Sequence, residues 1–164
     1  MKRNVLIIGA GGVAHVVAHK CAQNAGALGD IHIASRTLAK CEAIAASVRE
    51  RGSGAIPSCH RVDAMDSTAV AALIRDTGTR IVINVGSPFV NMSVLDACIE
   101  TGAAYIDTAI HEVPEAICET PPWYANYEWK KRDACAAAGV TAILGASALK
   151  TEPPSRALLV SRSG

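Results

Sequence analysis

The chain begins with an apolar run that leads directly into a cluster of glycines. Residues 5–8 read Val-Leu-Ile-Ile, glycines follow at positions 9 and 11, and an alanine stands at position 14. This spacing is the G-x-G-x-x-G/A fingerprint of a strand, a tight turn and a helix that together bind a dinucleotide. Gly9 allows the sharp bend, Gly11 leaves room for a diphosphate, and Ala14 lets the helix approach the sheet. The first 15 residues therefore predict a nucleotide site; the alternative is a glycine-rich turn without a ligand.

The rest of the chain alternates between strand-like and helix-like segments. Strands are expected near 4–8, 30–35, 57–62, 80–84, 105–107 and 140–144. Helices are expected near 12–26, 37–51, 67–77, 91–101 and 123–138, and Asp66 with Ser67 forms a helix start of the capping type. This alternation predicts an α/β fold: a doubly wound, mostly parallel six-stranded sheet of the Rossmann type, in the order 3-2-1-4-5-6.

Composition narrows the class of protein. The net charge of +1, with both signs interspersed, argues against nucleic acid and anionic membranes as partners. No apolar run approaches the roughly 20 residues that span a bilayer, and the short lead into the first strand does not resemble a signal peptide. The six cysteines include no C-x-x-C pair, which argues against a zinc or disulfide framework. Buried, reduced thiols in a cytoplasmic protein are the expectation.

The end of the second expected strand indicates which dinucleotide is bound. An NAD site usually has an acidic residue there, about 20 residues after the glycines, to bind the ribose hydroxyls. This chain instead has Ser35, Arg36 and Thr37, and its next carboxylate is Glu42. A guanidinium can pair with a 2′-phosphate through two hydrogen bonds, so NADP is the predicted cofactor. The alternative is that Arg36 is a solvated charge and that NAD is accepted too.

Ligands of open α/β sheets bind outside the carboxyl ends of the strands, so the residues there are further candidates. Asp63 and Ala64 follow the third strand, where adenine is expected. Asn84 ends the fourth strand beside the expected path of the nicotinamide. Asp107 and Thr108 follow the fifth strand, where a carboxylate would meet a substrate amine; the alternative is an aspartate that caps a loop.

Histidines and aromatic residues offer weaker signals. His15 and His19 stand four apart in an expected helix, but no third metal ligand is evident, so we interpret them as histidines of the core or its edge. His111 and Glu112 form an acid–base pair in sequence, without a fixed geometry. Four aromatic residues near the fifth expected helix favour a docking surface for another domain or subunit; they are Trp123, Tyr124, Tyr127 and Trp129.

Five segments taken in order resemble the saccharopine dehydrogenase family, most of all its carboxynorspermidine/carboxyspermidine dehydrogenase branch. They are residues 9–14, 35–41, 84–89, 105–108 and 123–124, and the resemblance extends over about residues 1–146. It implies an NAD(P)-dependent oxidoreductase that acts on a C–N bond. In polyamine biosynthesis such an enzyme reduces the imine of a diamine and aspartate semialdehyde; in lysine metabolism it handles saccharopine.

By position, the resemblance assigns residues to two roles. Asp107 and Thr108 would border an amino-acid or polyamine-type substrate. The cofactor-binding residues would be Gly9, Gly11, Gly12, Val13, Ala14, Ser35, Arg36, Thr37, Asp63, Ala64, Asn84 and Val85.

The chain departs from the family after its sixth expected strand. The family continues there with Gly-Ala-Gly-Phe-Asp-Pro-Gly and a long catalytic domain, whereas Gly145 and Ala146 are followed here by a short Arg/Ser-rich end. We therefore expect a nucleotide-binding domain over 1–146 and an irregular tail over 147–164, with the catalytic domain absent. Such a chain would bind cofactor with little turnover. Whether it forms a homodimer is not decided by the sequence.

Two other functions are compatible with the same fold. The first is a non-catalytic module that senses nucleotides and regulates a partner. The second is a small short-chain reductase, which is disfavoured because no Tyr-x-x-x-Lys motif stands at a suitable helix position.

Overall fold

One sheet runs through the computed structural model, which describes residues 2–52, 55–113, 125–146 and 158–160. Its strand order is β3-β2-β1-β4-β5-β6-β7. The first six strands are mutually parallel, and this confirms the predicted Rossmann sheet and its order. Their bounds are β1 Asn4–Ile8, β2 Ile31–Ser35, β3 Ser58–Arg61, β4 Thr79–Asn84, β5 Ala104–Asp107 and β6 Ala142–Leu144.

A seventh strand corrects one expectation. Residues 147–164 carry no strand period in the sequence, yet β7 (Leu158–Val160) pairs antiparallel with β6 at the edge of the sheet. Backbone pairing to an open sheet edge needs no alternation of apolar side chains, so the sequence pattern gives no signal for it. The other residues of this segment, and with them most of the expected tail, lie outside the described residues.

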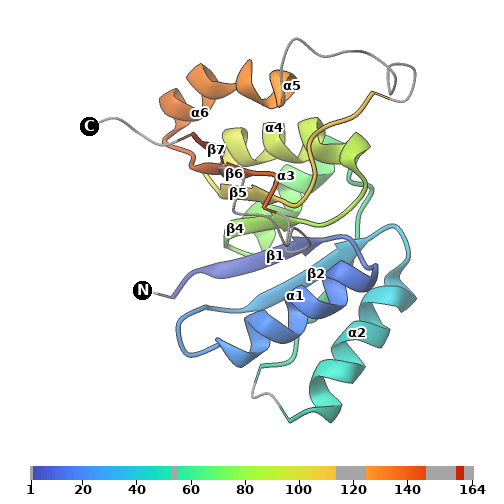
Figure 1. The fold of residues 1–164 in the computed structure, drawn as a ribbon. Coiled ribbons are helices and arrows are strands. Elements are labelled where there is room, and N and C mark those ends of the chain that lie inside the picture. Colours follow the sequence, from blue (N-terminus) through green and yellow to red (C-terminus); the bar gives the residue numbers. More distant parts are fainter. Residues whose placement is uncertain (1, 53–54, 114–124, 147–157, 161–164) are drawn as a thin grey trace, which may run out of the picture.

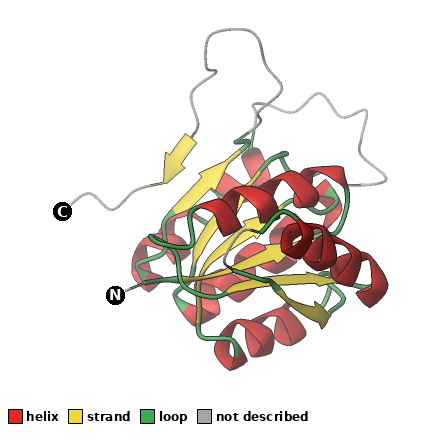
Figure 2. Cartoon of the chain, turned by 90° about the horizontal axis from the view of Figure 1, so that it is seen from below, coloured by secondary structure: helices red, strands yellow, loops and turns green. Residues whose placement is uncertain are grey.

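Helices cover both faces of the sheet (Figures 1 and 2). On one face lie α1 (Gly12–Gln23) and α2 (Leu38–Glu50). On the other lie α3 (Ser67–Asp76), α4 (Asn91–Thr101), α5 (Asn126–Trp129) and α6 (Arg132–Ala138), with a short 3₁₀ turn, η1 (Pro88–Val90), before α4. The single helix expected over 123–138 is therefore wrong in its described part, because the chain breaks between α5 and α6 at Lys130 and Lys131.

The alternation of side chains along β1 explains the two layers. Val5 and Ile7 face the core beneath α1 and α2, while Leu6 and Ile8 face the core beneath α3 and α4. All four are at most 2% exposed. A strand that is apolar on both faces is typical of the centre of a parallel sheet, and it fixes β1 there.

Helix ends follow the expected local rules. The Asp66 carboxylate accepts a hydrogen bond from the Ala69 amide at 3.0 Å, which confirms the predicted start of α3. Gly102 and Gly139 end α4 and α6 in the left-handed conformation, with φ of 72° and 68°. Among the described residues, no helix combines the length and apolar character needed to cross a membrane.

The connections diverge at the carboxyl ends of the two central strands, β1 and β4. After β1 the chain crosses to the face of α1, and after the neighbouring β4 it crosses to the face of α4. Their carboxyl ends therefore diverge at the place where doubly wound sheets bind ligands.

Candidate functional site

The turn after β1 is held between the ends of two neighbouring strands. The Gly9 amide donates to the Ala34 carbonyl of β2 at 2.9 Å, and the Val85 amide after β4 donates to the Ile8 carbonyl at 2.9 Å. Gly9 has φ of +114°, and a Cβ there would lie 2.9 Å from the Val85 carbonyl oxygen. Both the backbone angle and the close approach require glycine at this position.

The next two glycines border open space instead of protein. A Cβ added at Gly11 or Gly12 would have no described protein atom within 4 Å, and both residues are exposed. Gly11 is the N-cap of α1 and offers no side chain to cap it, and the first turn contains no acidic residue. The His15 amide is the first to reach a carbonyl, that of Gly11 at 3.1 Å.

The entrance of α1 is therefore a cradle for an anion. The amides of Gly12, Val13 and Ala14 precede the first intrahelical donor; Gly12 and Val13 are exposed, so their amides remain available as donors at the positive end of the helix, whereas Ala14 is buried. The missing side chains at Gly11 and Gly12 leave room for a ligand to reach them. A dinucleotide diphosphate fits this donor set and this space.

The end of β2 lies beside this cradle, because Ile8 of β1 pairs with Ala34 of β2. The Ser35 hydroxyl donates to the Thr37 carbonyl at 2.9 Å and accepts from the Thr37 amide at 3.2 Å, so it closes a small turn. This turn presents Arg36 to solvent, and no acidic side chain of the described residues pairs with it. An exposed, unpaired guanidinium is available to bind a phosphate.

The end of β3 approaches from the other side of β2. The Asp63 carboxylate is exposed and accepts from the Met65 amide at 3.0 Å. The Ala64 carbonyl accepts from the Ser93 hydroxyl of α4 at 2.6 Å, so this loop is tied to the second helix layer. No role was predicted for Ser93, since a serine within a helix has no pattern that identifies its partner.

The ends of β4 and β5 carry a buried hydrogen-bond network. Asn84 pairs in register with Asp107, and the two are 2% and 1% exposed. The Asn84 amide nitrogen donates to Asn91 Oδ1 at 2.8 Å, while Asn84 Oδ1 accepts from the Gly86 amide at 3.1 Å. Asn84 thereby fixes the loop after β4, which contains Val85 and borders the glycine turn.

Asp107 holds the centre of this network. Its Oδ1 accepts from the Gly145 amide at 2.6 Å, and its Oδ2 accepts from the Tyr105 hydroxyl at 2.9 Å. The structure thus places the Asp107 carboxylate in the interior, whereas Thr108 is half-buried. Asn91 also donates to the Ala109 carbonyl at 2.6 Å, which holds the loop after β5.

Burial controls the protonation of this cluster. It raises the pKa of Asp107 to about 7, against the opposing effect of the hydrogen bonds from Gly145 and Tyr105, and the nearby Glu128 raises it further. Burial and the neighbouring Asp107 also raise the pKa of the Tyr105 phenol. Asp107 therefore titrates near neutral pH.

A second buried carboxylate holds the loop that follows. Glu128 of α5 is 2% exposed, and its Oε1 accepts from the His111 amide at 2.6 Å. His111 Nδ1 lies 3.0 Å from the Pro88 carbonyl, to which it donates. Glu112 is exposed, so His111 and Glu112 are not brought together as an acid–base pair. Asn91 and Glu128 were missed from the sequence, because each stands in a helix where exposed polar residues are common.

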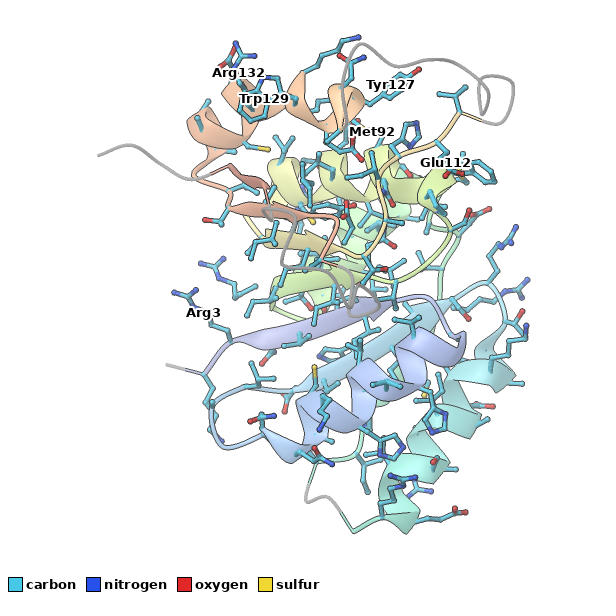
Figure 3. All side chains as sticks on the ribbon, in the orientation of Figure 1. Arg3, Met92, Glu112, Tyr127, Trp129 and Arg132 are labelled. Carbon is cyan, nitrogen blue, oxygen red and sulfur yellow. The ribbon has the colours of Figure 1, made fainter. Side chains whose placement is uncertain are left out.

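The aromatic residues after this loop are described only in part. Trp123 and Tyr124 lie outside the described residues. Tyr127 and Trp129 of α5 are half-buried, with Lys130 and Arg132 over their rings at 5.6 Å and 5.7 Å from the ring centroids (Figure 3). The docking surface expected here stays a prediction.

Comparisons with known proteins bear on this site. Residues 5–143 match the family described as the saccharopine dehydrogenase NADP binding domain. The chain is 41% identical over 146 residues to a carboxynorspermidine synthase from Vibrio alginolyticus, covering 87% of this chain and 35% of that protein. It is 40% identical over 141 residues to a carboxyaminopropylagmatine dehydrogenase from Synechocystis, covering 86% of this chain and 33% of that protein. The chain thus spans about a third of the length of these relatives.

A solved structure shares the fold at lower identity. Saccharopine dehydrogenase (L-Glu forming) from Saccharomyces cerevisiae has a TM-score of 0.59 and 20% identity, over 88% of this chain and 27% of that one. The family match confirms the resemblance found from the sequence motifs and the prediction of NADP as the cofactor. The roles of the individual site residues stay predictions.

Proposed function

The chain belongs to the saccharopine dehydrogenase NADP-binding domain family, and from this premise we propose that it holds NADP(H) across the glycine turn and the end of β2. One observation supports this most directly. The unpaired amides at the entrance of α1 lie beside a strand end that presents an exposed Arg36. This pairing of an anion cradle with an exposed guanidinium suits a diphosphate and a 2′-phosphate on one molecule.

We assign a different part of the cofactor to each strand end. The amides of Gly12 and Val13 bind the diphosphate, with Ala14 holding the helix against the sheet behind them, and Arg36 with the Ser35–Thr37 turn binds the 2′-phosphate. Asp63 and Ala64 border the adenine. Asn84 and Val85 border the nicotinamide path, where the Asn84 side chain keeps the loop in place through the Gly86 amide.

For the whole protein of which such a domain is part, we propose an NADP-dependent oxidoreductase acting on a CH–NH bond. NADPH, when bound, supplies the hydride for reduction of an imine carbon. The substrate is of the amino-acid or polyamine type. The names of the relatives, carboxynorspermidine synthase and carboxyaminopropylagmatine dehydrogenase, support this substrate class. Thr108 borders it, and Asp107 acts from the interior by fixing the loops that follow β5 and β6.

On its own, the chain is proposed to bind cofactor with little turnover. Hydride transfer requires the acceptor carbon to be held at near-attack distance from the nicotinamide. This positioning lowers the activation barrier by several kcal/mol. The strand ends described here supply the cofactor side of that arrangement.

We also propose a cytoplasmic location. Five cysteines of the described residues are free thiols, which supports this location.

The experiment is a titration of the purified chain with NADPH and with NADH, followed by nicotinamide fluorescence. We expect saturable binding of NADPH below millimolar concentration and weaker binding of NADH. Absence of saturation with either nucleotide at millimolar concentration would contradict the proposed site. Oxidation of NADPH with a diamine and an aldehyde that form an imine should be near background; a rate close to that of the full-length relatives would refute the proposal of little turnover.

A further inference from the structure

A lysine stands at a helix position that normally favours a carboxylate. Thr37 is the N-cap of α2, which makes Lys40 the third residue of the helix. In the capping box, a threonine N-cap is followed at this third position by Glu or Gln. Here the position holds Lys40, the first turn contains no acidic residue, and the Thr37 amide is bonded to Ser35 Oγ instead. The sequence therefore departs from the local pattern of helix starts at this residue.

The charge of Lys40 adds to others of the same sign. Arg36 is exposed just ahead of the helix, and the amino end of a helix itself carries a partial positive charge. No ion pair of the described residues includes Arg36 or Lys40. A cation in the first turn opposes helix formation, so the stability of α2 does not explain this lysine. A residue that breaks a local rule in this way is expected at a functional site.

Contacts between α1 and α2 show from which side of α2 Lys40 projects. Ser47 Oγ lies 3.2 Å from His15 Nε2 and 3.1 Å from His19 Nε2 of α1, which are ordinary hydrogen-bond distances. Lys40 precedes Ser47 by seven residues, or two helical turns, so it leaves α2 on the same flank. Glu42 precedes Ser47 by five residues and leaves the helix on a different flank. Lys40 therefore lies on the flank of α2 that faces α1.

The position of Lys40 along α2 brings it to the edge of the sheet where the glycine turn lies. Two turns of helix span about 11 Å, counted from Ser47 toward the amino end of α2. The two helices follow neighbouring parallel strands, so their amino ends lie at the same edge of the sheet (Figure 1). Lys40 and Arg36 therefore border, from the side of α2, the space that Gly11 and Gly12 leave open at the entrance of α1.

We propose that Lys40 is the second cation of the 2′-phosphate site and that, together with Arg36, it sets a preference for NADPH over NADH. This inference rests on the proposed function, because it assigns a residue to the same cofactor. A phosphate monoester carries a charge of about −1.5 to −2 near pH 7, and one guanidinium does not neutralise it. Arg36 offers a planar contact with two hydrogen bonds, and Lys40 adds a point charge on a flexible stem. NADH has a hydroxyl in place of this phosphate and gains nothing from the second cation.

The test compares the binding of NADPH and of NADH to the full chain and to Lys40→Gln by nicotinamide fluorescence. We expect Lys40→Gln to weaken NADPH binding about tenfold, or about 1.4 kcal/mol, and NADH binding by less than about twofold. Added salt should weaken NADPH binding less steeply in this variant, because one charge pair fewer is screened. Lys20→Gln is the matched control: it removes an exposed lysine from the last turn of α1, so both affinities should stay unchanged.

A second variant separates nucleotide binding from the stability of the helix. Lys40→Glu places a carboxylate at the amino end of α2, so it should raise the midpoint of thermal unfolding. The same change should weaken NADPH binding more than Lys40→Gln does, because the carboxylate repels the phosphate. A lysine that acted only through the structure of α2 would not change stability and affinity in opposite directions.

Failure of this inference differs from failure of the proposed function. If wild type shows no saturable binding of NADPH, or if Arg36→Ala leaves the ratio of NADPH to NADH affinity unaltered, both are overturned. If Arg36→Ala weakens NADPH binding while Lys40→Gln and Lys40→Glu do not, the nucleotide site stands and the role of Lys40 is overturned. Equal weakening of NADPH and NADH binding in Lys40→Gln also overturns that role, because the lysine would then not recognise the 2′-phosphate.

Discussion

The carboxyl ends of β1 and β2 and those of β4 and β5 both carry polar groups, but they use them in opposite ways. At β1 and β2 the amides of the helix entrance have no partner among the described residues, and Arg36 is exposed. At β4 and β5 the side chains of Asn84, Asn91, Tyr105 and Asp107 are buried and bonded to one another. In the first region the hydrogen-bond donors are available to a ligand. In the second region they form hydrogen bonds within the protein that hold the loops in place.

This difference separates binding from support. Substitutions in the first region should weaken nucleotide binding while the fold survives, except where the backbone itself requires glycine. Substitutions in the second should lower the free energy of unfolding first.

Gly9→Ala should have the largest effect, because Gly9 packs directly against the loop after β4, where the first region meets the second. The added Cβ would meet the Val85 carbonyl oxygen at 2.9 Å, and φ of +114° is strained for alanine. We expect a loss of about 3 kcal/mol in the free energy of unfolding and loss of NADPH binding. Gly11→Ala is the matched control: it meets no described protein atom within 4 Å, so it should fold normally but bind NADPH weakly. Equal stability of the two variants would contradict the account.

Asp107→Asn should destabilise the chain by about 2 kcal/mol at low pH, because the amide turns two hydrogens toward the three neighbouring donors, whereas the protonated acid carries only one. The pKa of Asp107 is raised from 3.8 to about 7 in the folded state. The neutral form is therefore favoured by folding, and its stabilisation is fully present below about pH 4 and lost as the pH rises through about 7. Denaturant unfolding from pH 4 to 8 should show wild type losing stability relative to Asp107→Asn. A constant difference between the two proteins would show that Asp107 does not titrate in this way.

Arg36→Ala sharpens the comparison from the binding side. It should weaken NADPH binding at least tenfold, or about 1.4 kcal/mol, with little change for NADH and none in stability. Arg49→Ala, an exposed arginine near the other end of α2, is the control and should change neither affinity. An unaltered ratio of NADPH to NADH affinity in Arg36→Ala would remove the basis for 2′-phosphate recognition.

Arg75→Ala should have the smallest effect. Arg75 of α3 and Glu100 of α4 form an ion pair of 2.6 Å at the last turns of these helices, which precede the amino ends of β4 and β5, but both side chains are 53% exposed. An exposed pair contributes less than about 1 kcal/mol, and salt screens it. A loss of thermal stability as large as that of Asp107→Asn would mean that exposed ion pairs stabilise this fold as much as the buried network does.

The first region could be predicted from the sequence more fully than the second. The glycine spacing, the apolar strand before it and the missing carboxylate near Arg36 each reflect a local backbone or charge requirement, which a sequence displays directly. The order of the six parallel strands follows from alternation with helices. Strand β7 could not be predicted from this alternation, because it pairs with the exposed edge of the sheet at β6.

The second region could be identified only as polar. Asp107 was singled out, but its burial depends on Tyr105 reaching it from the same strand and on Gly145 arriving from the end of β6. Glu128 depends on the loop after β5 folding back to α5. Contacts between residues far apart in the chain have no local pattern, and the same holds for Ser47 beside the two histidines of α1.

The most direct test of the account follows individual amides by NMR while NADPH is added to the chain. The amide resonances of Gly11, Gly12, Val13 and Arg36 should shift saturably and together, with one dissociation constant. The Gly145 amide, which is already bonded to Asp107, should barely move. Saturable shifts confined to the β5 and β6 ends, or no shifts at the entrance of α1, would contradict the claim that this entrance holds the diphosphate.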